Sequence, residues 1–205
     1  MKIFALANNY RPHNKTGDAA LYNPEEPVLF TKTDSALLKD RKPFFVPDHL
    51  GRIEGEAEVV VRISRLGKNI AQRFAHRYYD AITMGIDFGA VEVLGRLREK
   101  GQSWELAKSF DGSAAIGEWV DKTLFRNIHA LDFHLDTNGK TTQVGNTIDL
   151  FYGIDETIAY LSQFFTLKTG DLLFTGCPMG GQTINVNDQL TGYLGERKVL
   201  EISCK

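Results

Sequence analysis

GEAEVVVRIS, residues 55–64, is the stretch that decides the fold. Its run of three valines is typical of a strand, and glutamates occupy every second position at Glu54, Glu56 and Glu58. Because successive side chains of a strand point to opposite faces, we expect all three carboxylates on one face. Like charges repel, and a buried carboxylate is costly unless a positive group neutralises it. That face is therefore expected either to be open to water or to hold a cation.

The composition is that of an ordinary globular domain. The chain has 205 residues, of which 42% are hydrophobic and 24% charged, with a formal net charge of -2. This length favours one domain with its own core, spanning residues 1–205. The charge argues against binding to nucleic acid or an anionic membrane, and no apolar run approaches the ~20 residues of a membrane span. Two cysteines are too few for a disulfide scaffold, so we expect reduced thiols and a cytoplasmic protein.

Local patterns place helices among more numerous strands. Apolar spacing predicts helices over residues 69–81, 90–101 and 154–165, and Asn138-Gly139 predicts a tight hairpin. Residues 11–26 are polar and rich in turn formers, which indicates a mobile lid. Strands and helices do not alternate regularly. The pattern therefore favours an α+β, mostly β fold over a doubly wound sheet.

The glutamate strand could supply ligands for a hard divalent cation. Mg²⁺ prefers oxygen ligands, and Glu56 and Glu58 would present two carboxylates on one strand face. Asp87, which ends an apolar strand just before a helix, is the best candidate for a third ligand. On spacing alone, an acidic strand edge that faces solvent is the commoner arrangement.

A set of segments carries a resemblance to a known family. The order of PVLFTK, EAEVVVRI, GIDF, WELAKSFD, NGKTTQVGNT and LKTGDLLFTGCPMG resembles the fumarylacetoacetate hydrolase family over residues 7–205. Members of this family cleave, decarboxylate, hydrate or isomerise β-dicarbonyl and α-keto acids with a divalent metal ion. The resemblance implies a mixed β-sheet roll with a few peripheral helices, a homodimer, a small keto-acid substrate, and Mg²⁺ or Mn²⁺ as cofactor.

The resemblance also implies residue roles. The family's metal ligands fall on Glu56, Glu58 and Asp87, and its active-site lysine falls on Lys108. An ammonium group beside a bound keto acid would stabilise a developing enolate. Within NYRPH, His13 falls on the general base, a residue type that titrates near neutral pH.

A glycine-rich turn completes this set. In GDLLFTGCPMG, the hydroxyl of Thr175 and the amide of Gly176 fall on the groups that bind the substrate carboxylate. Glycine allows backbone N–H groups to approach an anion closely. The turn is therefore expected at the substrate site.

Several positions depart from the family pattern, and three of them concern the base and the contacts to substrate. Thr16 replaces a glutamate that forms a dyad with His13, Val91 replaces an arginine, and Leu94 replaces a glutamine. Loss of the guanidinium removes a bidentate anchor, and Leu94 would make that wall of the site apolar.

Two functions remain open on the sequence. The first is a divalent-metal-dependent enzyme acting on a small α-keto or β-diketo acid by C–C bond hydrolysis, decarboxylation or keto–enol isomerisation. Without the dyad glutamate, decarboxylation and isomerisation are favoured, because neither needs a strongly activated water. The alternative is a metal-binding paralogue with weakened or lost catalysis that serves as a ligand-binding or scaffolding protein.

Overall fold

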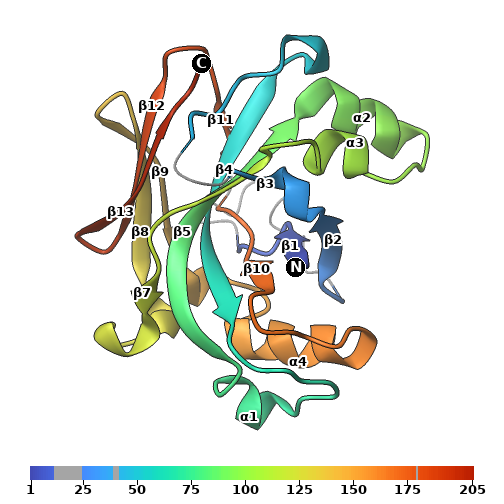
Figure 1. Ribbon diagram of the computed structural model, residues 1–205, viewed down its shortest axis with the longest axis vertical. Coiled ribbons are helices and arrows are strands. Elements are labelled where there is room, and N and C mark those ends of the chain that lie inside the picture. Colours follow the sequence, from blue (N-terminus) through green and yellow to red (C-terminus); the bar gives the residue numbers. More distant parts are fainter. Residues whose placement is uncertain (12–24, 39–41, 179) are drawn as a thin grey trace.

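Two long antiparallel strands form the centre of the molecule (Figure 1). The computed structural model describes residues 1–11, 25–38, 42–178 and 180–205. In it the glutamate strand is β4 (Ile53–Ile63), and it pairs along its length with β5 (Tyr79–Ala90). His13, Thr16 and most of the expected lid lie outside the described residues.

The central pair belongs to a large mixed sheet. Its remaining strands are β1 (Ile3–Ala7), β2 (Val28–Lys32), β3 (Leu37–Leu38), β6 (Ala114–Ile116), β7 (Val120–Asp121), β10 (Leu172–Phe174) and β11 (Gln182–Thr183). Within the described residues the strand order is β2-β1-β10-β4-β5-β6-β3, with β11 paired to β4 and β7 paired to β5. The pairs β1–β10 and β3–β6 are parallel and the others antiparallel. This arrangement confirms the predicted mostly β fold.

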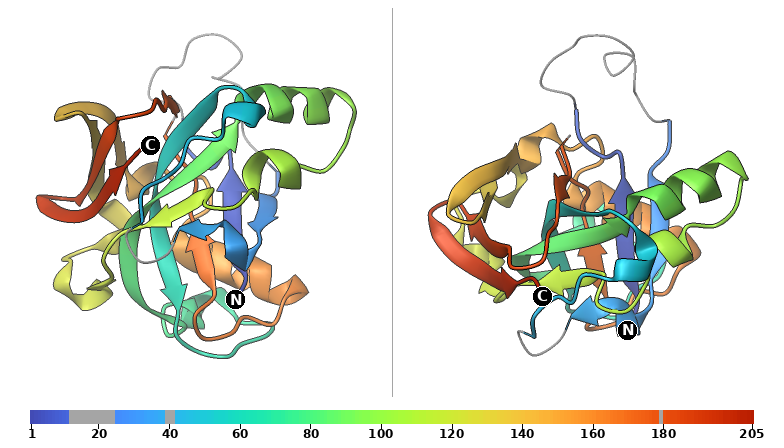
Figure 2. Two further views of the ribbon diagram at one scale, coloured as in Figure 1. Left: turned by 45° about the horizontal axis from the view of Figure 1, so that its top comes forward. Right: turned by 90° about the horizontal axis from the view of Figure 1, so that it is seen from above.

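A smaller sheet lies beside β5 (Figures 1 and 2). Its strands are β8 (Asp132–Thr137), β9 (Lys140–Asn146), β12 (Gln189–Leu194) and β13 (Arg197–Ser203), in the order β13-β12-β8-β9. The predicted hairpin is confirmed between β8 and β9, where Asn138 and Gly139 have φ of 54° and 77° as a two-residue turn of this type requires. Apolar side chains from both sheets share one buried core.

In the part of the chain that the structure describes, a few short α-helices surround the sheets. They are α1 (Gln72–Ala75), α2 (Val91–Glu99), α3 (Glu105–Lys108) and α4 (Ile154–Phe164). The helices predicted over 90–101 and 154–165 are confirmed as α2 and α4. None of the helices in the described part of the chain combines the length and apolar character needed to cross a membrane.

The helix predicted over 69–81 is wrong. Only α1 forms there, and Tyr79 already begins β5 opposite Ile63. Phe74, one of the apolar residues that suggested the helix, is 39% exposed. Ile70 and Tyr78 contact the core but Phe74 does not, and pairing with β4 determines the structure from Tyr79 onward.

Gly85 in β5 is a packing point that tolerates no side chain. A Cβ there would lie 2.6 Å from Cγ2 of Val60 and 2.8 Å from the carbonyl oxygen of Ala115.

We expect Gly85→Ala to lower the free energy of unfolding by about 1–3 kcal/mol, measured by urea denaturation, because the core would be overpacked. The matched control is Gly95→Ala in α2, where a Cβ meets nothing within 4 Å. It should leave stability unchanged or raise it by up to ~1 kcal/mol. Equal effects of the two substitutions would contradict this view of the packing.

Candidate metal centre

The register of the central pair brings three carboxylates together. Glu56 lies directly opposite Asp87, and Glu58 follows two residues later on the same face of β4. One carboxylate oxygen from each residue lies within 4.8 Å of the other two. Glu58 and Asp87 are each 1% exposed, whereas Glu56 is half-buried. The structure thus unites the three residues that the sequence singled out and buries two of them.

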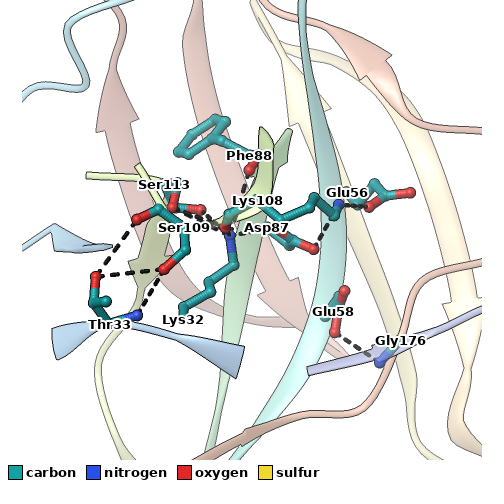
Figure 3. A network of polar contacts seen from close by, with 10 residues as sticks. All are labelled: Lys32, Thr33, Glu56, Glu58, Asp87, Phe88, Lys108, Ser109, Ser113 and Gly176. Atoms are coloured by element: carbon teal, nitrogen blue, oxygen red, sulfur yellow. Dashed lines mark hydrogen bonds and ion pairs between the residues drawn. The ribbon is translucent and has the colours of Figure 1, made fainter. Parts of the chain in front are cut away.

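Two lysines face this cluster from other elements (Figure 3). Nζ of Lys108, at the end of α3, lies 2.6 Å from Oε2 of Glu56 and 2.7 Å from Oδ2 of Asp87. Nζ of Lys32, at the end of β2, lies 2.7 Å from Oδ1 of Asp87. Gly89 leaves room for Lys108, since a Cβ at this glycine would lie 3.2 Å from its Nζ. Asp87 is therefore held between two ammonium groups.

Lys32 was given no role by the sequence analysis. Its side chain is fully enclosed, and its ammonium donates to the carbonyl of Ser113 at 3.0 Å, to the hydroxyl of Ser113 at 3.2 Å and to the carbonyl of Lys108. These contacts join β2 to the segment that carries Lys108. The sequence feature that could have indicated this role is a lysine at the end of a strand of apolar residues, because a buried ammonium group needs a partner of opposite charge.

Burial and neighbouring charges shift the protonation of the cluster. Burial raises the pKa of Glu58 above its usual range, and the carboxylates of Asp87 and Glu56 raise it further. Burial alone would lower the pKa of Lys108, but Asp87 and Glu56 outweigh it and raise this pKa. Burial lowers the pKa of Lys32, which Asp87 partly offsets. Lys108 therefore stays protonated, and Glu58 ionises less readily than a free glutamate.

The hydrogen-bond donors of the glycine-rich turn point to the carboxylate cluster and to β4. The amide of Gly176 donates to Oε2 of Glu58 at 2.7 Å, and the hydroxyl of Thr175 donates to the carbonyl of Val59 at 2.9 Å. Asn9 in turn donates to the carbonyl of Thr175 at 2.9 Å. The donors of Thr175 and Gly176 are thus used inside the protein. Their assignment to a substrate carboxylate stays a prediction.

A cavity of about 670 Å³ opens onto the carboxylates. Lys108 and Phe30 line it beside the cluster, and Val91 and Leu94 from α2 line a further wall. This is the apolar wall that the sequence led us to expect. Cys177 also lines the cavity, and burial together with Glu56 raises the pKa of its thiol, which keeps it protonated.

The donor atoms fit a hard divalent ion. All three groups offer carboxylate oxygens, the ligands that Mg²⁺ and Mn²⁺ prefer. Oδ1 of Asp87 is buried and, despite its ion pair with Lys32, accepts no well-aligned hydrogen bond from the described residues. Glu56, Glu58 and Asp87 are therefore the residues that could hold a metal.

Comparison with known proteins decides the family. The fumarylacetoacetate (FAA) hydrolase C-terminal family matches residues 2–205. The chain belongs to the fumarylacetoacetate hydrolase family. This confirms the resemblance drawn from the sequence, and the enzymes of this family to which the chain is similar act on keto acids.

Three relatives of this fumarylacetoacetate hydrolase family protein are informative. It is 33% identical over 191 residues to "Oxaloacetate tautomerase YcgM" of Escherichia coli (strain K12), covering 93% of this chain and 86% of that protein. It is 31% identical over 188 residues to "Oxaloacetate tautomerase FAHD1, mitochondrial" of Rattus norvegicus, covering 92% and 84%. The crystal structure of fumarylpyruvate hydrolase from Pseudomonas aeruginosa in complex with Mn²⁺ and pyruvate superposes with a TM-score of 0.89 at 26% identity, covering 100% and 89%.

These comparisons leave some expectations as they were. The relatives include a bacterial and a mitochondrial protein, so the cytoplasmic location stays a prediction. The homodimer and the single-domain organisation also stay predictions.

The Lys32–Asp87 pair gives a stability prediction. Replacing Lys32 with Met would leave a buried carboxylate with one ammonium partner fewer, and removal of one member of a buried ion pair typically costs about 3–5 kcal/mol. We expect Lys32→Met to reduce the free energy of unfolding by that amount in urea denaturation. The control is Lys198→Met, which removes an exposed pair with Glu201 and should cost less than about 1 kcal/mol. A Lys32→Met protein as stable as this control would show that Asp87 does not need Lys32.

Proposed function

We propose that the protein is a divalent-metal-dependent enzyme that acts on a small α-keto or β-diketo acid. The observation that supports this most strongly is the convergence of three carboxylate oxygens within 4.8 Å beside the ammonium of Lys108. A solvated acidic strand edge would not bury Glu58 and Asp87 to 1% exposure. This burial supports a binding site over a solvated strand edge.

Glu56, Glu58 and Asp87 would hold the ion, Mg²⁺ or Mn²⁺. When bound, it would act as a Lewis acid toward the oxygens of a keto acid. The Mn²⁺ and pyruvate in the related Pseudomonas aeruginosa structure support this choice of ion and substrate. Gly176 would contribute by holding Oε2 of Glu58 through its amide, so we infer an orienting role for it beside the substrate-binding role expected from the sequence.

Lys108 is the residue on which the chemistry would depend. Its pKa is raised by Asp87 and Glu56, so it stays an ammonium at neutral pH and can donate a hydrogen bond to an oxygen that gains negative charge. In keto–enol isomerisation that oxygen is the enolate oxygen. A proton leaves the enol oxygen and another is added to the adjacent carbon, and we propose His13 for this transfer.

Isomerisation is the reaction that we favour. It requires no activated water, which agrees with Thr16 at the position where the family pattern has the dyad glutamate. The two curated relatives described above are named oxaloacetate tautomerases, which supports the same reaction type. The retained carboxylates and Lys108 favour an active enzyme over a scaffolding paralogue.

Lys108→Met should separate catalysis from metal binding. We expect Mg²⁺-dependent loss of the enol absorbance of oxaloacetate or an acylpyruvate to slow by about 100-fold or more, because an enolate donor is lost. Calorimetry should show that the variant still binds Mg²⁺. Glu54→Gln is the matched control, because Glu54 lines the cavity but pairs with Arg52 outside the cluster. A Lys108→Met enzyme as fast as wild type would exclude this role, and no turnover by wild type with any keto acid would contradict the proposed function.

Metal binding should depend on pH through Glu58. Its pKa is raised, so the folded protein keeps this carboxyl protonated at a pH where a free glutamate is ionised, and an ion must displace that proton. We expect Mg²⁺ affinity to rise as the pH rises above the range in which a free glutamate ionises, with protons released on binding. Calorimetry in two buffers of different ionisation enthalpy measures this release. In Glu58→Gln both the release and the tight binding should be lost, and binding that is independent of pH in wild type would contradict the assignment.

A further inference from the structure

Helix α2 presents one face to the cavity, and the character of that face changes along its length. Val91, Leu94, Gly95 and Arg98 all line the cavity. Their spacing of i, i+3, i+4 and i+7 places them on one side of the helix. Val91 and Leu94 stand nearer to Asp87 in the chain, and Arg98 stands seven residues beyond Val91, about 10 Å along the helix axis. The wall is therefore apolar near the carboxylates and cationic at its far end.

Aromatic rings connect the two cationic groups of the cavity. Nζ of Lys108 lies 5.4 Å from the ring centroid of Phe30, whose ring lies 6.0 Å from that of Trp104. The guanidinium of Arg98 lies over the opposite end of this row, 4.6 Å from the Trp104 centroid. Stacking on an indole orients a guanidinium and leaves its N–H edge available to a planar anion.

Among the residues that the structure describes, no carboxylate lies within ion-pair distance of the Arg98 guanidinium. Glu92 on the same helix pairs with Arg52 instead. An arginine that is oriented by an aromatic ring, lines a cavity and lacks a carboxylate is suited to receive one from a ligand. The apolar stretch between it and the metal centre suits a hydrocarbon tail.

We infer that Arg98 is a specificity-determining residue that binds an acidic group at the far end of the substrate. This rests on the proposed function, in which the keto-acid end of the substrate lies at Glu56, Glu58 and Asp87. The preferred substrate is then a keto acid whose tail carries a second carboxylate several carbons away. The family pattern has an arginine at the position of Val91. Arg98, two helical turns further along α2, would supply a guanidinium in its place.

The test compares two acylpyruvates of equal chain length, one ending in a methyl group and one in a carboxylate. Wild type should prefer the carboxylate-ended compound in kcat/KM, and Arg98→Gln should reduce this preference by about 10- to 100-fold, through KM rather than kcat. Arg98→Lys should retain part of it, because the charge remains without the planar fork. A preference that is unchanged in Arg98→Gln, or an equal loss for both compounds, would overturn the inference.

Arg96→Gln is the matched control. Arg96 is exposed on the same helix, about 200° around its axis from Arg98, and does not line the cavity. The Arg96→Gln variant should keep the wild-type preference for the carboxylate-ended compound. If this preference fell as far as in Arg98→Gln, the effect would come from the general charge of α2.

A binding measurement separates this inference from the proposed function. Calorimetry in the presence of Mg²⁺ would compare an unreactive saturated diacid with the monoacid of the same length. Tighter binding of the diacid that is lost in Arg98→Gln supports Arg98 even if no keto acid is turned over. Equal binding of both acids by wild type, together with turnover of keto acids, leaves the proposed function standing and rejects Arg98.

Discussion

The pairing of Asp87 with two lysine ammonium groups is the interaction on which the rest of the site depends. Lys32 reaches this carboxylate from β2 and Lys108 reaches it from α3, so three segments distant in sequence are fixed around one buried charge. An uncompensated charge in such a place would cost several kcal/mol, which makes this arrangement obligatory once the fold has formed. When Glu58 is also ionised, the cluster holds three carboxylates against two ammonium groups, and this excess negative charge favours the binding of a further cation.

The sequence predicted the parts of the site that follow local rules. Alternation in β4 placed Glu56 and Glu58 on one face. The apolar run before Asp87 marked a strand, but the prediction that Asp87 ends it is wrong, because pairing with β4 extends β5 to Ala90. The closeness of Asp87 to Glu56 depends on strand register, which tertiary pairing sets. Spacing made Asp87 only a candidate, and the family resemblance implied its place beside Glu56 and Glu58. The partnership of Lys32 with Asp87 depends on the curl of the whole sheet. The same tertiary control replaced the expected helix at 69–81 by the start of β5.

Two of the departures from the family pattern, Val91 and Leu94, lie in one region of the cavity. Val91 and Leu94 belong to α2, whereas the carboxylates and Lys108 lie on β4, β5 and α3. Under the proposed function, these two differences concern the surface that a substrate tail would contact. The glycine-rich turn at Thr175 and Gly176 also affects the site, through contacts inside the protein. Its donors hold Glu58 and Val59 in place, so it acts on the shape of the centre through the protein's own hydrogen bonds.

The direct junction of β5 with α2 has an evolutionary consequence. Asp87 is anchored by the sheet, while α2 begins at Val91 and is fixed to the core by Val93 and Leu97 on its other side. Gly95 and Arg98, which face the cavity from α2 and are exposed, can therefore mutate without disturbing the core or the charged centre, whereas Leu94 also packs against the core. Such a division lets a lineage explore new substrates by drift along a single helix while its chemistry is kept. It also makes α2 a compact unit for grafting between relatives.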